Sequence, residues 1–247
     1  MIAFLDAEMT SLLEPQLLSL ALVTLDGREH YVELDLSSEA GKPRRQASSD
    51  FVEYDGVLDM WGLVPDSTST PWEMGRRTGE WLLRHARESG TRIEVAFDYS
   101  TDYELMEYAV RDSGLWDQVR EVVTPIDAGA LTGSPEGEIA AEECFRELHR
   151  RGLARHHALA DAIALRAAYI AVKALTMQMA HATHSDAFRQ LAKHALQLGF
   201  DEAWLRTWMR KPAFALGGRP PMDVLNEPGG LEVLQDIIGR IAYGVYT

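Results

Sequence analysis

Two acidic side chains end the first apolar run of the sequence. Ile2 to Leu5 are all apolar, as in a buried strand, and Asp6 and Glu8 follow them. Residues two apart on a strand share a face, so the two carboxylates should lie side by side. Like charges this close repel unless a cation lies between them, and carboxylate oxygens suit Mg²⁺ and Mn²⁺. A solvent-exposed strand end would accept the same residues, so the pair predicts a metal site only if further carboxylates join it.

Two more aspartates follow a later strand. The run Arg92–Phe97 has the composition of a strand, and Asp98 and Asp102 stand where it passes into a helix. Thr101 is a favourable N-cap, and Glu104 stands three residues on, which is the spacing of a capping box. Capping would explain either aspartate by itself. Convergence on the first acidic pair is the alternative.

A histidine pair precedes a fifth acidic residue. If a helix begins near Ala158, Asp161 lies in its first turn and His156 lies in the loop before it, with His157 next to it. A histidine beside a helix-held carboxylate suits a general base that deprotonates water at a metal ion. Two surface histidines ahead of a helix are the plainer interpretation.

The elements that would carry these residues alternate in an α/β pattern. Residues 17–24 and 29–36, joined by an Asp26-Gly27 turn, predict an antiparallel meander with the first strand. Residues 37–50 are polar and predict a loop, and the segment 51–63 is ambiguous. The remaining predicted elements are a helix from Pro71 to about Glu88, a strand at 92–97, a helix at 102–113, a strand at 119–125, and helices at 135–151 and from about 156 to 179. This order predicts a mixed sheet flanked by helices.

Composition and charge narrow the class of protein. With 247 residues and a net charge of −14, the chain is an unsuitable general binder of nucleic acid. The negative charge lies in residues 1–172, which hold 31 acidic and 16 basic side chains, whereas residues 173–247 hold 7 and 8. Bound cations can supply local positive charge, so a short strand end is a more plausible substrate than a long duplex. The single cysteine, Cys144, excludes an internal disulfide, and the absence of a long apolar run or signal-peptide pattern predicts a cytoplasmic protein that does not bind membranes.

The three acidic motifs together resemble those of a known enzyme family. D-x-E, an aspartate after a later strand, and H-x-A-x-x-D at the start of a late helix are the order found in DEDDh (proofreading-type, DnaQ-like) 3′–5′ exonucleases. The resemblance covers about residues 1–175. The matching residues are Asp6 and Glu8, then Asp102 with Leu105 and Met106, and finally His156, Ala158 and Asp161.

This resemblance implies a ribonuclease H-like fold and hydrolysis of phosphodiester bonds with two Mg²⁺ or Mn²⁺ ions. The implied ligands are Asp6, Glu8, Asp102 and Asp161, with Asp98 as the alternate to Asp102, and the implied base is His156. Met9 and Thr10 replace the first residues of the usual Thr-Thr-Gly, where the terminal nucleotide would bind. Arg155, with Arg150 and Arg151, could hold phosphates of a short single strand or overhang, for which RNA is preferred over DNA.

The last part of the chain predicts a small helical domain. Its helices are expected at 185–198, 202–209 and 231–243, with a turn-rich passage at 211–221 followed by residues 222–225 and a break at Pro228-Gly229-Gly230. Trp204, Trp208, Tyr243 and Tyr246 are many aromatic residues for so short a segment, which favours an interaction module.

The ordered residues of this part resemble the Xre/MbcA/ParS toxin-binding domain of antitoxins. They are Trp204-Leu205, Pro212, Leu216-Gly217-Gly218-Arg219-Pro220-Pro221, Leu225 and Gly239-Arg240-Ile241-Ala242-Tyr243-Gly244-Val245. The resemblance spans about residues 185–247 and implies a RES-type, NAD-consuming toxin as partner. Self-association through the helices, giving a homodimer, is the alternative. The helix-turn-helix that usually precedes this region is replaced here by the exonuclease-like part.

The sequence therefore predicts an exonuclease-like domain at 1–178 and a helical interaction domain at 179–247. A metal-dependent 3′–5′ exonuclease is the favoured function, because a mere scaffold has no physical need for four converging carboxylates. The alternatives are an antitoxin-like binding protein in which the nuclease fold is a scaffold, and a phosphatase or nucleotidase that uses the same metals.

Overall fold

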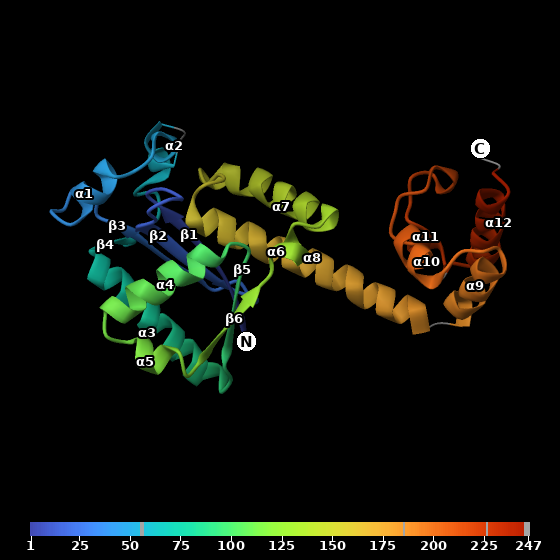
Figure 1. Ribbon diagram of the computed structural model, residues 1–247, viewed down its shortest axis with the longest axis horizontal. Coiled ribbons are helices and arrows are strands. Elements are labelled where there is room, and N and C mark those ends of the chain that lie inside the picture. Colours follow the sequence, from blue (N-terminus) through green and yellow to red (C-terminus); the bar gives the residue numbers. More distant parts are fainter. Residues whose placement is uncertain (55–56, 185, 226, 245–247) are drawn as a thin grey trace. The chain divides into compact units, whose positions relative to one another are not determined.

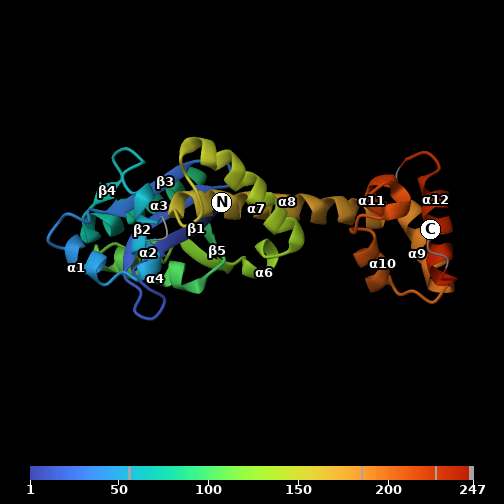
Figure 2. The same cartoon turned by 90° about the horizontal axis from the view of Figure 1, so that it is seen from above.

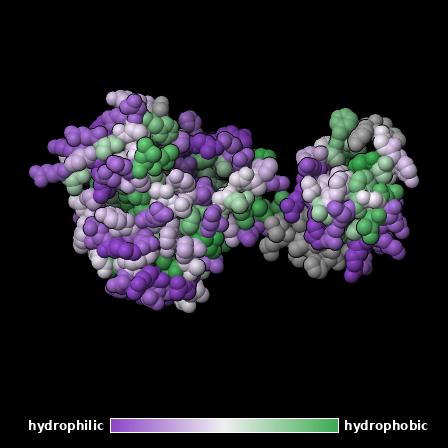
Figure 3. Space-filling view, viewed as in Figure 1, coloured by the Kyte–Doolittle hydropathy of each residue, from purple (hydrophilic) through white to green (hydrophobic). Residues whose placement is uncertain are grey.

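A computed structural model describes residues 1–54, 57–184, 186–225 and 227–244. The chain divides into two compact units, Met1–Val172 and Lys173–Thr247 (Figure 1). Each unit is described by itself. Polar side chains cover much of the face seen in Figure 3, and no helix in the described ranges is long and apolar enough to cross a bilayer.

The N-terminal unit is built on a six-stranded mixed sheet with the order β4-β3-β2-β1-β5-β6. Its strands are β1 (Ile2–Met9), β2 (Leu17–Thr24), β3 (Glu29–Leu34), β4 (Thr68–Ser69), β5 (Ile93–Phe97) and β6 (Val123–Asp127). Strands β1 to β3 form the antiparallel meander, and β5 and β6 extend the sheet in parallel with β1. The predicted α/β class is confirmed, and the sheet is ribonuclease H-like. β1, the acidic strand, lies in the interior of the sheet.

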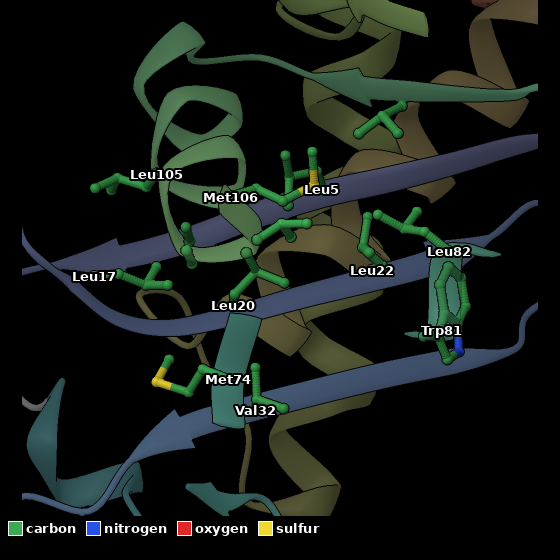
Figure 4. Packing of buried hydrophobic residues seen from close by; sticks show 14 of the residues in the cluster. Leu5, Leu17, Leu20, Leu22, Val32, Met74, Trp81, Leu82, Leu105 and Met106 are labelled. Carbon is green, nitrogen blue, oxygen red and sulfur yellow. The ribbon is translucent and has the colours of Figure 1, made fainter. Parts of the chain in front are cut away.

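Alternation along β1 decides where its acidic residues point. Leu5 packs in the large core beneath α3 (Pro71–Ser89) and α4 (Ser100–Asp112), together with residues of β2, β3 and both helices (Figure 4). Phe4 belongs to a different cluster, with Leu165 of α8 (Ala158–His184), on the other face of the sheet. Because side chains alternate, Asp6 and Glu8 continue the Phe4 face and project toward α8.

Helices cover both faces of the sheet. The others of this unit are α1 (Gly41–Gln46), α2 (Asp50–Tyr54), the 3₁₀ turn η1 (Leu58–Met60), α5 (Trp116–Val119), α6 (Gly129–Thr132), α7 (Pro135–Leu148) and the 3₁₀ turn η2 (His149–Arg151). α7 lies along α8 in both views (Figures 1 and 2), and Phe145 and Leu148 of α7 pack with the start of α8. α3 starts as predicted: Thr70 caps it in a capping box with Glu73.

Several predicted boundaries of the N-terminal unit are wrong. The segment 37–50 is not all loop, since it contains α1, whose Pro43 lies in the first turn where a missing N–H costs little. The sixth strand begins at Val123 rather than at 119, because Trp116–Val119 form the short helix α5.

The capping box predicted at Thr101 is also wrong. α4 begins two residues earlier than predicted, at Ser100, and its N-cap is Tyr99, which makes no side-chain cap bond. The backbone N–H of Asp102 donates to the carbonyl of Tyr99 at 3.2 Å. Thr101 is therefore already inside the first turn.

The C-terminal unit is a small helical bundle. It contains α9 (Asp186–Gln197), α10 (Glu202–Trp208), the 3₁₀ turn η3 (Phe214–Leu216), α11 (Pro221–Val224) and α12 (Gly230–Ala242). α9, α10 and α12 agree with the three predicted helices to within one residue, whereas η3 and α11 were not predicted. Leu191, Leu205, Leu234 and Ile238 are fully buried at its centre.

Candidate metal centre

Five carboxylates converge at the end of β1 on the face that α8 covers. The first cluster consists of Asp6, Asp98 and Asp102, and the second of Asp6, Glu8 and Asp161. Within each cluster one carboxylate oxygen from every member lies within 4.8 Å of the others. Asp6 belongs to both clusters. The structure thus brings together every acidic residue that the three sequence motifs singled out, including both candidates of the second motif.

Each carboxylate is positioned by the element that carries it. Asp102 is in the first turn of α4 and is only 3% exposed, so the helix holds its side chain in the interior. Asp98 follows directly after β5 and is exposed. Asp161 is in the first turn of α8, and its Oδ2 accepts a hydrogen bond from the backbone N–H of His156 at 2.7 Å. This bond joins the loop before α8 to the acidic cluster.

The carboxylates raise one another's pKa. Burial, and then the charges of Asp161, Asp102 and Glu8, raise the pKa of Asp6 well above its usual range. Burial is also the main cause for the others: the pKa of Glu8 is raised to about 8, that of Asp102 to about 8, and that of Asp161 to about 7. Such shifts mean that the ionised forms are strongly disfavoured near neutral pH without a counter-charge.

The donor set fits divalent cations. No lysine, arginine or histidine in the described ranges makes an ion pair with the five carboxylates; Arg155, which lies nearby, is paired with Glu142. All the converging ligand atoms are carboxylate oxygens, which are the hard ligands that Mg²⁺ and Mn²⁺ prefer. The cluster therefore has the composition of a site for one or two hard dications.

The two histidines before α8 have different surroundings. His156 is exposed, has a left-handed backbone (φ 66°), and packs its ring edge-on against Phe51 at 4.8 Å between centroids. His157 is 3% exposed and stacks on Tyr31 at 4.7 Å, and neither ring nitrogen has a hydrogen-bond partner among the described residues. Burial lowers the pKa of His157 to about 4. Only His156 is open to a water molecule or a ligand.

The residues predicted to bind substrate have mixed surroundings. The Thr10 side chain is buried, and its hydroxyl donates to the carbonyl of Glu14 and accepts from the N–H of Gln16, each at 3.1 Å. It therefore fixes the loop after β1. Met9 is half-buried and packs against the large core. Arg155 is exposed and lines a cavity of about 500 Å³ that also includes Asp6 and Asp161.

Three residues near the cluster carried no recognisable sequence signal. Phe51 lies in the segment without a clear pattern, and its contact with His156 depends on the fold of α2. Glu142 and Phe145 lie on α7, far from any motif, and both contact Arg155. Their places could be found only from the packing of α7 along α8.

The comparisons with known proteins concern the other unit. Residues 194–244 match the family model of the antitoxin Xre/MbcA/ParS C-terminal toxin-binding domain. This confirms the resemblance for the C-terminal unit, over the part from within α9 to just after α12. No curated protein matches the chain.

Some ordered residues of that domain are explained by the fold of this chain. Gly217 and Gly218 both have positive φ (66° and 82°), and Arg219 forms an ion pair with Glu227 at 2.5 Å. These residues shape the turn between η3 and α11.

The fold of this chain does not explain two other ordered residues of that domain, Gly239 and Tyr243. A Cβ added at Gly239 would meet nothing within 4 Å, although glycine inside a helix costs stability. Tyr243 is 78% exposed. Both line a cleft of about 480 Å³ between α9 and α12, which also includes His194, Leu198 and Arg240. Tyr246, the other tyrosine noted in the sequence, lies outside the described residues.

Proposed function

We propose that the N-terminal unit, residues 1–178, is a metal-dependent 3′–5′ exonuclease of the DEDDh type. One observation carries the proposal: five carboxylates from β1, the end of β5, α4 and α8 converge without a cationic partner among the described residues. Stabilising such a group of charges requires bound cations, and the motif order of the sequence supplies the same residues. The proposed substrates are short single strands or 3′ overhangs, with RNA preferred.

The carboxylates divide naturally into two sets of ligands. Asp6, Glu8 and Asp161 would hold one Mg²⁺ or Mn²⁺ ion, and Asp6 with Asp102 and Asp98 would hold a second. When bound, the ions would supply the positive charge that polarises a phosphodiester and stabilises its transition state.

The protein's own groups would position and deprotonate the attacking water. The exposed His156 would act as the base. The hydrogen bond from its backbone N–H to Asp161 holds the loop before α8 against the carboxylate cluster. Desolvation and the neighbouring Arg155 lower the pKa of His156, so its imidazole is neutral near pH 7 and can accept a proton.

The test is incubation of the full chain with 5′-end-labelled RNA and DNA oligonucleotides of matched sequence, with Mn²⁺ or with chelator. The expected result is a ladder shortened one nucleotide at a time from the 3′ end, in Mn²⁺ only, and faster for RNA. Asp6→Asn should remove the activity, whereas Asp201→Asn, an exposed cap in the other unit, should not. Phosphate release from nucleoside monophosphates with intact oligonucleotides would instead establish the phosphatase alternative.

A second function is favoured by the C-terminal unit, residues 179–247. The family match names a toxin-binding domain, and the open position at Gly239 lets another backbone approach α12 closely. We infer that the α9–α12 cleft binds a RES-type toxin. Calorimetric titration of the full chain with such a toxin should show binding that Asp6→Asn leaves unchanged. Self-association without toxin binding, seen by analytical ultracentrifugation, would contradict this inference.

A further inference from the structure

The cavity beside the carboxylate cluster has an unusual balance of charge. It has a volume of about 500 Å³ and is bounded by α7 on one side and by the first turns of α8 on the other. Among its lining residues, five are acidic (Asp6, Asp98, Glu138, Glu142 and Asp161), and only Arg155 is basic. A polyanion that enters this cavity has one protein cation to meet.

Arg155 is held in place by two residues of α7. Its guanidinium lies over the Phe145 ring, 4.4 Å from the centroid, and forms an ion pair with Glu142. Stacking on an aromatic face fixes the plane of the guanidinium while leaving its N–H edge available for a bidentate anion. In the free protein that edge is turned to the Glu142 carboxylate.

The Arg155–Glu142 pair is exchangeable. The two side chains are 52% and 59% exposed, and ion pairs this exposed contribute little to stability. A phosphodiester presents oxygens similar to those of a carboxylate and would compete for the same guanidinium edge.

We propose that Arg155 is the phosphate-binding residue of this cavity, and that Glu142 occupies its guanidinium until a substrate phosphate replaces it. The proposal rests on the exonuclease function. The ligand is one nucleotide unit of the substrate strand, because about 500 Å³ is the size of a small-molecule site and not of an extended groove. Glu142 then lowers the affinity for substrate by the cost of releasing Arg155.

The chain contains a matched control pair. Arg76 and Glu80 of α3 form an ion pair at 2.7 Å with side chains 37% and 54% exposed, and the Arg76 guanidinium lies over the Trp72 ring, 5.7 Å from its centroid. Neither lines the cavity. Charge changes at this pair alter the net charge equally but leave the proposed subsite untouched.

The experiment measures binding separately from catalysis. Fluorescence anisotropy of a 5′-fluorescein RNA trinucleotide is recorded with the full chain carrying Asp6→Asn, to which Arg155→Gln, Glu142→Gln, Arg76→Gln or Glu80→Gln is added. We expect Arg155→Gln to raise the Kd by about tenfold and to reduce the slope of log Kd against log salt by about 0.7. Glu142→Gln should lower the Kd by about threefold, and the control variants should change it by less than about twofold.

Two results would overturn the inference. One is an Arg155→Gln Kd equal to that of Arg76→Gln, and the other is weaker binding by Glu142→Gln. The same variants in the otherwise unchanged chain separate this failure from failure of the exonuclease function. Mononucleotide release that is insensitive to Arg155 refutes the subsite alone. An absence of release by the unmodified chain, with binding still dependent on Arg155, refutes the exonuclease and keeps the subsite.

Discussion

Asp6 and Asp201 are the same residue type in opposite situations. In the N-terminal unit, Asp6 is half-buried among four other carboxylates, with no ion pair in the described part of the chain. In the C-terminal unit, Asp201 is exposed and caps α10 by accepting the N–H of Trp204 at 2.7 Å. The crowding of negative charge around Asp6 opposes folding, whereas the cap that Asp201 makes on α10 stabilises the folded state.

The two units also differ in how their acidic side chains are paired. The acidic side chains of the C-terminal unit that make ion pairs each have an arginine partner, as in Arg206–Glu202, Arg219–Glu227 and Arg240–Asp236. The N-terminal unit pairs many of its surface charges similarly, but its five converging carboxylates have no ion pair in the described part of the chain. Unfavourable charge retained at one place is typical of a site that functions with a ligand. The predictions below test this contrast.

The largest expected effect is that of Asp6→Asn. Asp6 is shared by both carboxylate clusters, so its loss should reduce Mn²⁺-dependent nucleotide release by about 10³-fold or more. Because one crowded charge is removed, the melting temperature in chelator at pH 8 should rise. Asp201→Ala should do the reverse: full activity, with stability lowered by about 1 kcal/mol through the lost cap. A loss of activity in Asp201→Ala as large as that in Asp6→Asn would contradict the contrast between the two aspartates.

His156→Ala should reduce the rate by about 10²- to 10⁴-fold, which is the usual contribution of a general base. Stability should change little, because His156 is exposed. His149→Ala, an exposed histidine of the neighbouring 3₁₀ turn, is the control and should retain the wild-type rate. Single-turnover kinetics at saturating oligonucleotide will separate the chemical step from binding. A normal rate for His156→Ala would remove this residue from the mechanism.

The pH dependence of stability should have an unusual sign. The folded pKa values of Glu8 and Asp102 (about 8) and Asp161 (about 7) exceed the unfolded values of about 4, so the folded chain binds more protons. Their stabilising contribution is full below pH 4 and is lost as pH rises through 7 to 8. The buried His30 and His157 have pKa values lowered to about 3 and about 4. Their contribution to stability is therefore lost as the pH falls below about 6.5, and it does not change between pH 7 and 8.5.

Thermal unfolding in chelator should therefore show a falling melting temperature between pH 7 and 8.5. Mn²⁺ should restore the loss, because cations replace the missing protons. The Asp6→Asn variant should show a shallower fall. A melting temperature that is constant across this interval, with and without Mn²⁺, would mean that the carboxylates are not electrostatically crowded.

The smallest effect is expected at Gly239 of α12. Gly239→Ala should stabilise the full chain by about 0.5 to 1 kcal/mol, since the added methyl meets no neighbour and alanine favours the helix. The same substitution should weaken binding of a RES-type toxin if a partner backbone approaches there. Urea unfolding and calorimetric titration measure the two quantities. If the unmodified chain and Gly239→Ala bound the toxin with equal affinity, the toxin would not contact α12 at Gly239.

The sequence predicted the features that depend on local pattern. The strands of the meander and the helix α3 follow from apolar patterning, and their bounds differ little from those observed, whereas α8 extends five residues beyond its predicted end. Short elements were missed: α1 and α5 contain too few residues to show a period, and β4 is only two residues long. The capping box predicted at Thr101 is wrong because α4 starts two residues earlier, at Ser100, so the Thr101–Glu104 spacing falls inside the helix.

The sequence also predicted some residues of the candidate site and missed others. Strand alternation placed Asp6 and Glu8 on one face, whereas Asp161 joined them only through the resemblance to the exonuclease motifs. The motif spacing favoured Asp102 and kept Asp98 as the alternate, and the structure brings both near Asp6. The contacts of Phe51 and Glu142 depend on how α2 and α7 pack, which no local pattern encodes.

Titration of the metal-free full chain with Mn²⁺, followed by isothermal calorimetry, tests the central claim most directly. The account predicts saturable binding of Mn²⁺, accompanied by proton release at pH 7.5, because the raised pKa values leave protons to be displaced. Asp6→Asn should abolish both the binding and the release, and Asp201→Asn should leave them unchanged. Identical titration curves for all three proteins would contradict the claim that these carboxylates form a metal centre.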